Sequence, residues 1–324
     1  MPTVAPLDLD GHCVVAAFVS DIPHFALADG VVHRLDHGHK SATAHDGLLC
    51  ATVAQDGRSL LTGGEDGKVC ALTADGSAAL LADIGRKWIS HVAAGPQGAV
   101  AWASGRRAAV RFADGKVREL DHPRTVEGVA FAPKGMRIGV ARYNGVTLHF
   151  PSTEGKPVEL QWDGAHTGIT FSPDGNFVVT TMQENALHGW KLADGKHMRM
   201  SGYPAKVKSL SWSAKGRWLA SSGAPAAILW PFHAKDGPMG KAPLELGTRG
   251  NAMVTAVACH PADEIMAIGY EDGMVLAARF ADAKEVLLRR PGKGAISTMG
   301  WDSEGRRLAF GSTAGDCGVV DISA

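Results

Sequence analysis

Phe171-Ser172-Pro173-Asp174-Gly175 decides how this chain folds, because close copies of it return along the sequence. Phe131-Ala132-Pro133-Lys134-Gly135 and Trp212-Ser213-Ala214-Lys215-Gly216 are two of these copies. In each copy an apolar run ends in a tight turn, where Pro can preset the backbone dihedral and Gly accepts a positive φ. A second apolar run, a second turn and a third run follow. The chain therefore repeats one unit made of strands and tight turns.

The repeat has a period of about 40 residues, close to that of a four-stranded propeller blade. The first-turn glycine returns at intervals of 37 to 41 residues at Gly57, Gly98, Gly135, Gly175 and Gly216, and again at Gly305. Weaker copies of the turn occur near Pro23 and Asp263. The second turn often contains Asn-Gly or Asp-Gly, which are strong hairpin signals. No amphipathic helix of convincing length interrupts the pattern.

The third run of each unit closes on a bulky residue, such as Trp190 or Trp230. With these features the chain resembles the WD40-repeat β-propeller family over nearly its full length, although its repeats are degenerate. The family buries a hydrogen-bond network of His, Ser/Thr, Asp and Trp. His45, Thr62 and Asp66 come nearest to that set, with Leu72 at the tryptophan position.

The resemblance implies an all-β propeller of four-stranded antiparallel blades. Eight copies of the first turn favour eight blades, and seven is the alternative. Thr3–Leu9 has no partner within its own repeat, so we expect it to close the ring as the outer strand of the last blade, because open sheet edges invite aggregation. We expect a single domain over residues 1–324, with a surface insertion at Ala234–Gly250.

Composition gives the chain no general attraction to nucleic acid or membrane, because 33 Lys and Arg balance 33 Asp and Glu. The charges are nevertheless uneven: residues 86–142 carry 11 basic and 4 acidic side chains, whereas residues 1–85 carry 4 and 11. The five dispersed cysteines suit reduced thiols. No targeting segment or membrane span is readable. These features predict a cytoplasmic protein without a nucleic acid partner.

The sequence predicts no catalysis and no cofactor. It lacks the usual hydrolase, metalloprotease, phosphate-loop and dinucleotide signatures. The predicted inner strands contain a single acidic residue, Glu127. One alternative is a small-molecule hydrolase at the central channel, near His91 and Glu127. Another alternative is a metal-binding propeller that uses the loop histidines His37, His39 and His45, because imidazole suits transition metals.

The main hypothesis is a protein-interaction scaffold. In the WD40 family, the loops before first strands and after second strands share one face, which commonly binds peptides. Trp, Tyr and Arg dominate binding hot spots, and Arg pairs well with carboxylates. We therefore expect a protein or acidic peptide to bind there. The candidate residues are Trp88, Arg106, Arg107, Arg124, Arg142, Tyr143, Arg249 and Tyr270.

Overall fold

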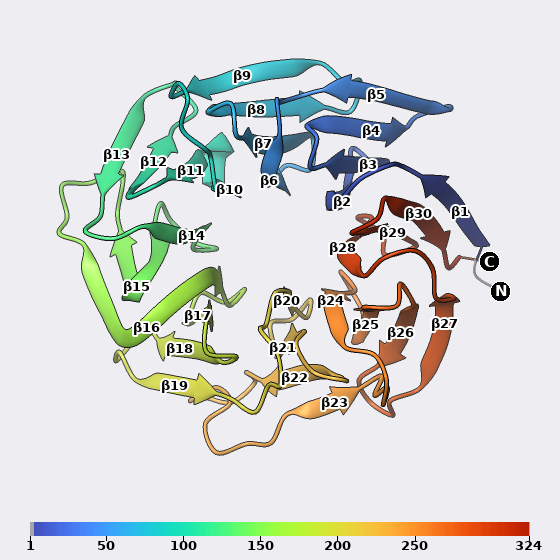
Figure 1. Ribbon diagram of the computed structural model, residues 1–324. Helices are drawn as coiled ribbons and strands as arrows, with labels where there is room; N and C mark the ends of the chain where they lie inside the picture. The colour runs from blue at the N-terminus through green and yellow to red at the C-terminus, as the bar shows by residue number, and fades with distance from the viewer. Residues whose placement is uncertain (1–2, 324) are drawn as a thin grey trace. The chain divides into compact units, whose positions relative to one another are not determined.

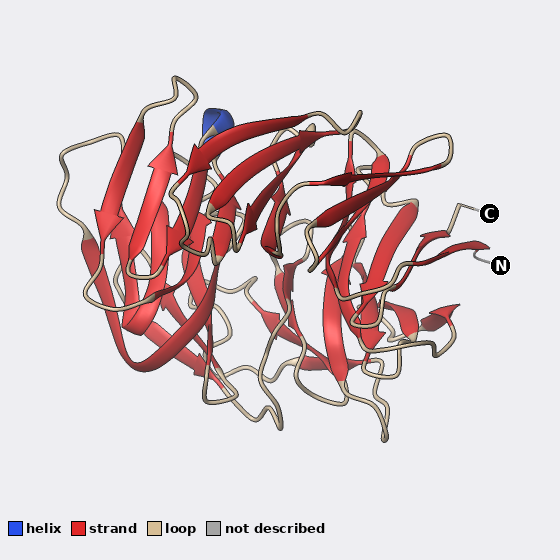
Figure 2. Cartoon of the chain, turned by 45° about the horizontal axis from the view of Figure 1, so that its top comes forward, coloured by secondary structure: helices blue, strands red, loops and turns tan. Residues whose placement is uncertain are grey.

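The computed structural model describes residues 3–323, and these form thirty strands with one short 3-10 helix, η1 (Pro96–Gly98). Figure 2 shows this composition, with strands joined by loops and one helical turn in blue. The chain divides into two compact units. One comprises residues 1–28, 32–40 and 202–324, and the other comprises residues 29–31 and 41–201. The single-domain organisation stays a prediction.

The recurring first-turn glycines explain where the strands end. Gly57, Gly135, Gly175, Gly216 and Gly305 have φ between 64° and 77°, a conformation that side-chain-bearing residues adopt at a steric cost. The second strands of the repeats are apolar runs buried on both faces, and in β17 (Phe177–Met182) all six residues are buried. Turn chemistry and apolar runs thus set the strand–turn alternation.

Neighbouring strands pair in antiparallel fashion, and most sheets hold four of them (Figure 1). In the first half of the chain the sheets contain β2 (Cys13–Val19), β3 (Ile22–Leu27), β4 (Val31–Leu35) and β5 (His39–Thr43); then β6 (Leu48–Val53), β7 (Ser59–Gly64), β8 (Lys68–Thr73) and β9 (Ala78–Asp83); then β10 (His91–Ala94), β11 (Val100–Ser104), β12 (Arg107–Arg111) and β13 (Val117–Asp121).

The second half of the chain continues the series with one wider sheet. It contains β14 (Val126–Phe131), β15 (Ile138–His149), β16 (Val158–Phe171), β17, β18 (Leu187–Lys191) and β19 (His197–Met200). Two four-stranded sheets follow, namely β20 (Leu210–Trp212), β21 (Trp218–Ser221), β22 (Ala227–Pro231) and β23 (Leu244–Leu246); and β24 (Val254–Cys259), β25 (Ile265–Tyr270), β26 (Val275–Arg279) and β27 (Glu285–Arg289).

The last sheet confirms the predicted role of the N-terminal strand. It has the order β1-β30-β29-β28, with β28 (Ile296–Trp301), β29 (Arg307–Ser312), β30 (Asp316–Asp321) and β1 (Thr3–Asp8). Val4 lies opposite Val320, and Asp8 lies opposite Asp316. The first strand of the chain therefore completes the sheet built by its last three.

The prediction of eight separate blades is wrong, since the described residues form seven sheets, which was the alternative. The reason lies in the six-stranded sheet. Two copies of the repeat, with first turns at Gly135 and Gly175, lie within it. β15 runs on through Asn144 and Gly145, where φ is positive, and β16 pairs with β15 through its first half and with β17 through its second.

The expected insertion at Ala234–Gly250 is also corrected. This segment contains β23, which pairs with β22 as the outer strand of its sheet, with Ala227 opposite Leu246. A strand of three residues that directly follows Pro243 carries too little apolar pattern to be recognised.

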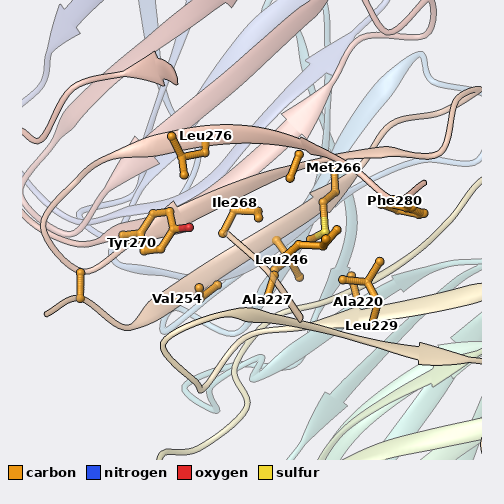
Figure 3. Close-up of a cluster of buried hydrophobic side chains, with 13 residues drawn as sticks. Ala220, Ala227, Leu229, Leu246, Val254, Met266, Ile268, Tyr270, Leu276 and Phe280 are labelled. Atoms are coloured by element: carbon orange, nitrogen blue, oxygen red, sulfur yellow. The ribbon is translucent and has the colours of Figure 1, made fainter. Parts of the chain in front are cut away.

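Neighbouring sheets bury apolar side chains between them. In the cluster of Figure 3, Leu229 and Leu246 from one sheet pack with Met266, Ile268 and Leu276 from the next. All five are buried. Burial of such side chains contributes roughly 1.5–3 kcal/mol each, so packing between sheets is a major source of stability.

Candidate functional site

A cavity of about 1050 Å³ lies beside the ends of β10 to β14, wholly within the unit that contains residues 41–201. Four chain segments line it. These are the loop from β9 to β10, the turn between β11 and β12, the end of β13, and the segment that leads into β14. The sequence analysis predicted the partner-binding face on loops of this kind.

The turn between β11 and β12 is held in place by the segment that precedes β14. Ser104 pairs with Arg107, and Gly105 takes a φ of 57° to reverse the chain. Val126 N donates to Gly105 O at 2.8 Å, and His122 N donates to Arg106 O at 2.9 Å. Arg106 and Arg107 therefore project from a backbone that is bonded on both sides.

The loop from β9 to β10 presents an exposed tryptophan because its neighbour is anchored. Ile89 is fully buried, and its N donates to Gly64 O at 3.0 Å. Trp88, the residue directly before Ile89, lines the cavity and is 62% exposed. An indole of this area in contact with water gains free energy when a partner covers it.

Charges around the cavity fall into paired and unpaired groups. Arg107 Nε donates to Asp121 Oδ1 at 2.8 Å, and Arg107 Nη1 lies 2.9 Å from Glu119 Oε2. The hydrogen bond that Arg107 donates to Asp121 raises the pKa of Arg107 above its ordinary value. Four other cations in these loops form no ion pair with any residue between 3 and 323. They are Arg86, Lys87, Arg106 and Arg124.

Two imidazoles and one carboxylate form a more buried part of the wall, namely His91, His122 and Glu127. Burial lowers the pKa of His91. Burial, assisted by the nearby His149, lowers the pKa of His122 to about 4, so this ring is neutral at pH 7. His122 is only 7% exposed, and its Nε2 has no hydrogen-bond partner among residues 3–323.

A buried polar network lies in the sheet of β6 to β9. His45 Nδ1 is 3.0 Å from Asp66 Oδ1, and His45 Nε2 is 2.8 Å from Thr62 Oγ1. Leu72 is buried where the family has tryptophan. The family model for "WD40: WD domain, G-beta repeat" matches residues 37–71, which contain this network. These residues therefore match a WD40 repeat, and the four-stranded antiparallel sheets are blades of a β-propeller.

Solved structures agree with this fold. The computationally designed Ika8 protein matches with a TM-score of 0.77 and 19% identity, over 97% of this chain and 98% of that one. The C-terminal WD40 domain of Sif2 matches with a TM-score of 0.77 and 13% identity, over 99% of each chain. The Neurospora crassa Pan2 WD40 domain matches with a TM-score of 0.66 and 11% identity, over 86% of this chain and 89% of that one. At these identities the likeness shows the fold alone.

A search among curated proteins finds no significant match to this propeller.

The WD40 propeller brings three of the predicted partner-binding residues to one cavity, which are Trp88, Arg106 and Arg107. Arg124 is exposed on the segment that leads to the cavity wall. Tyr143 is 51% exposed but does not line the cavity. Arg142 is buried, donates to Thr147 Oγ1 at 3.1 Å and pairs with Glu159.

The remaining two predicted residues belong to the other unit. Arg249 Nη2 pairs with Glu285 Oε2 at 2.6 Å. Tyr270 is fully buried and donates to Gly247 O. Because Arg142 and Tyr270 are buried and hydrogen-bonded within the protein, neither belongs to the proposed binding surface.

Glu119, Asp121 and His122 are cavity residues that sequence reasoning missed. The strand register holds the signal that could have found them, because Arg107 lies opposite Asp121 across β12 and β13. Opposite charges on facing residues of neighbouring strands attract each other.

The candidate metal ligands are engaged elsewhere or lie in solvent. His45 belongs to the buried network, and His39 Nε2 is 2.8 Å from His33 Nδ1. His37 has a side chain 98% exposed, with Nε2 3.9 Å from Asp36. Over the described part of the chain, no group of three or more His, Cys, Asp or Glu side chains is arranged to hold a metal ion.

The hydrolase alternative places His91 and Glu127 in one cavity, as the sequence suggested. Within residues 3–323, however, no hydrogen bond links the His91 ring to a nucleophile or carboxylate, so no catalytic pair is assembled.

Across residues 3–323 the structure contains no helix with the length and apolar character that a membrane span requires.

Proposed function

We propose that this WD40 propeller is a non-catalytic interaction scaffold that holds an acidic segment of a protein partner at the cavity of β10–β14. The observation that carries the proposal is the combination of an exposed Trp88 with unpaired Lys87 and Arg106 at one cavity. The cytoplasmic location and the single-domain organisation remain part of the same hypothesis.

Different groups of the cavity would provide affinity and selectivity for the partner. Covering Trp88 removes apolar area from water, which supplies binding free energy without a charge requirement. Lys87 and Arg106 attract carboxylates, which speeds association and disfavours basic partners. A turn held by hydrogen bonds at Gly105 and Arg106 loses little backbone entropy on binding.

The test is a selection of random displayed peptides on the immobilised protein. We expect the selected peptides to be rich in Asp and Glu, and to lose binding to the double variant Lys87→Glu/Arg106→Glu. The matched control is Lys134→Glu/Lys156→Glu, which makes the same charge change at exposed residues outside the cavity. Selected peptides without acidic enrichment, or peptides that bind the double variant as tightly, would contradict the proposal.

A further inference from the structure

Glu127 occupies a β-bulge at the cavity wall. In the pairing of β14 with β15, Val126 lies opposite Arg142 and Gly128 lies opposite Ala141, so Glu127 is an extra residue in its strand. Bulges bend a strand and re-aim a side chain, and they occur often beside functional sites. The bulge therefore makes Glu127 a candidate for a functional role.

The same bulge recurs in other first strands of the repeat, and in two of them the bulged residue has a structural task. In β24 it is Thr255, whose Oγ1 donates to Ile296 O at 2.7 Å. In β28 it is Ser297, whose Oγ donates to Cys13 O at 2.6 Å. In both sheets a hydroxyl donor ties the first strand to the backbone of the next first strand.

A carboxylate cannot perform that task, because it has no proton to donate to a carbonyl. Glu127 accordingly makes no hydrogen bond and no ion pair with any residue between 3 and 323, although it is half-buried and lines the cavity. An acceptor that is partly removed from water without a partner costs free energy. Glu127 thus makes no bond of the kind that Thr255 and Ser297 make, and it places a negative charge without a cation partner among residues 3–323 in the cavity.

We propose that Glu127 anchors a basic side chain of the bound partner, so that the partner presents a lysine or arginine flanked by acidic residues. This inference rests on the proposed function, and it adds the chemistry of the inserted residue. The unpaired cations Lys87 and Arg106 face the flanking acids, and Glu127 takes the inserted cation.

The cavity wall suits such an insertion in two further ways. The exposed indole of Trp88 offers area to the methylene stem and attraction to the cation, whereas the buried Trp102 contributes only to the cavity wall. The neutral ring of His122, with its unpartnered Nε2, adds a hydrogen-bonding group in a buried position. A cation bound among these groups would be charge-compensated by Glu127, because Glu119 and Asp121, the other two carboxylates that line the cavity, are paired with Arg107.

The experiment uses two labelled oligo-glutamate peptides that differ only at one central residue, lysine or norleucine. Fluorescence anisotropy gives Kd for the wild-type protein, for Glu127→Gln and for the control Glu154→Gln, which is exposed and outside the cavity. We expect the wild type and the control to prefer the lysine peptide roughly tenfold, because a hydrogen bond between two charged groups is stronger than one between neutral groups. Glu127→Gln should bind both peptides equally.

The outcomes separate this inference from the proposed function. Equal binding of both peptides to the wild type, with loss of both in Lys87→Glu/Arg106→Glu, would refute the anchor and leave the acidic-segment site standing. Failure of both peptides to bind would refute both proposals. A fall in the thermal midpoint of Glu127→Gln would also count against the anchor, because it would show that Glu127 has a structural task.

Discussion

Single residues show how this propeller fills one buried position with different chemistry. In the sheet of β20 to β23, Tyr203 does for Ser221 what His45 does for Thr62. Tyr203 Oη and Ser221 Oγ are 2.6 Å apart, and Trp230 Nε1 donates to Tyr203 Oη at 2.6 Å. Because Ser221 Oγ donates to Ile228 O, the tyrosine proton points to Ser221. Burial raises the pKa of Tyr203 to about 12, so the hydroxyl stays protonated.

Tyr203→Phe should therefore destabilise the protein although it removes one oxygen only. The change leaves Ser221 Oγ and Trp230 Nε1 without their buried partner, and an unsatisfied buried group costs about 1–3 kcal/mol. Urea unfolding measures the free energy. Tyr143→Phe is the matched control, because that side chain is half-exposed. Equal unfolding free energies for the two variants would contradict a stabilising network at Tyr203.

At the scale of elements, the pairing of β12 with β13 places a built-in competitor in the cavity. Arg107 is held by Glu119 and Asp121, two carboxylates on the facing strand. An acidic ligand must compete with them for the guanidinium. We expect Glu119→Gln/Asp121→Asn to bind an oligo-glutamate peptide about two- to fivefold more tightly, a modest gain because exposed ion pairs are weak.

Anisotropy titrations at low and physiological salt measure this gain, which should shrink as salt rises. The control is Glu154→Gln/Asp163→Asn, which removes the same charge outside the cavity. Weaker binding by the cavity variant would indicate that the two carboxylates contact basic groups of the ligand.

The docking of β1 is a second property of elements, and one glycine permits it. Leu9 N donates to Gly315 O at 2.8 Å, and a Cβ at Gly315 would lie 1.3 Å from Leu9 O. Gly98 has almost the same φ, 75° against 78°, but no atom within 4 Å of such a Cβ. Gly315→Ala should therefore cost more than Gly98→Ala, for which positive φ alone costs about 1–2 kcal/mol.

Thermal unfolding of the two variants gives the comparison, and limited proteolysis reports release of the N-terminal strand. We expect Gly315→Ala to unfold at lower temperature and to be cut earlier near its N-terminus. Equal behaviour of the two variants would mean that β1 adjusts its path around the new methyl group.

The sequence predicted elements well where turn chemistry and apolar runs agree. The N-terminal strand β1, for example, has the expected partner, the third strand of the last repeat. The sequence-based prediction was wrong where one strand extends across residues that are typical of a turn. Asn144 and Gly145 mark a turn in the sequence, yet both lie within β15, whose register with β16 shifts at this point from Ala165 to Gln161. Sheet boundaries depend on pairing between distant segments, which local propensity does not encode.

At the scale of the whole molecule, the sequence predicted the side chains of the site better than their surroundings. Trp88 and Arg106 lie at the cavity because the repeat places their loops at corresponding positions. The sequence analysis missed the burial of Arg142 and the pairing of Arg107, since both depend on the strand register that brings Glu159 and Asp121 from neighbouring strands to these arginines. Residue type set the candidates, and register decided which of them were available.

The whole molecule also has a predictable response to acid, because it buries several histidines. Burial lowers the pKa of six of them, to about 4 for His122 and to about 3 for His188. The other four are His24, His91, His149 and His166. In the unfolded chain these rings bind protons below about pH 6.5, whereas in the folded chain they stay neutral. Proton uptake therefore favours the unfolded state as pH falls.

The free energy of unfolding should accordingly fall between pH 7 and pH 5, before the carboxylates titrate. Although burial alone would raise it, the hydrogen bond from His45 holds the pKa of Asp66 below its ordinary value, so such groups stay ionised in this window. Urea unfolding at the two pH values measures the fall.

His188→Phe identifies one source of this acid sensitivity. His188 is fully buried between Trp162 and Trp190, and neither ring nitrogen has a hydrogen-bond partner among residues 3–323. Phenylalanine fits the same aromatic contacts and takes up no proton, so the variant should lose less stability between pH 7 and pH 5 than the wild type does. His12→Phe, at an exposed site, should keep the wild-type slope. A slope unchanged by His188→Phe would place the acid sensitivity in the other buried histidines.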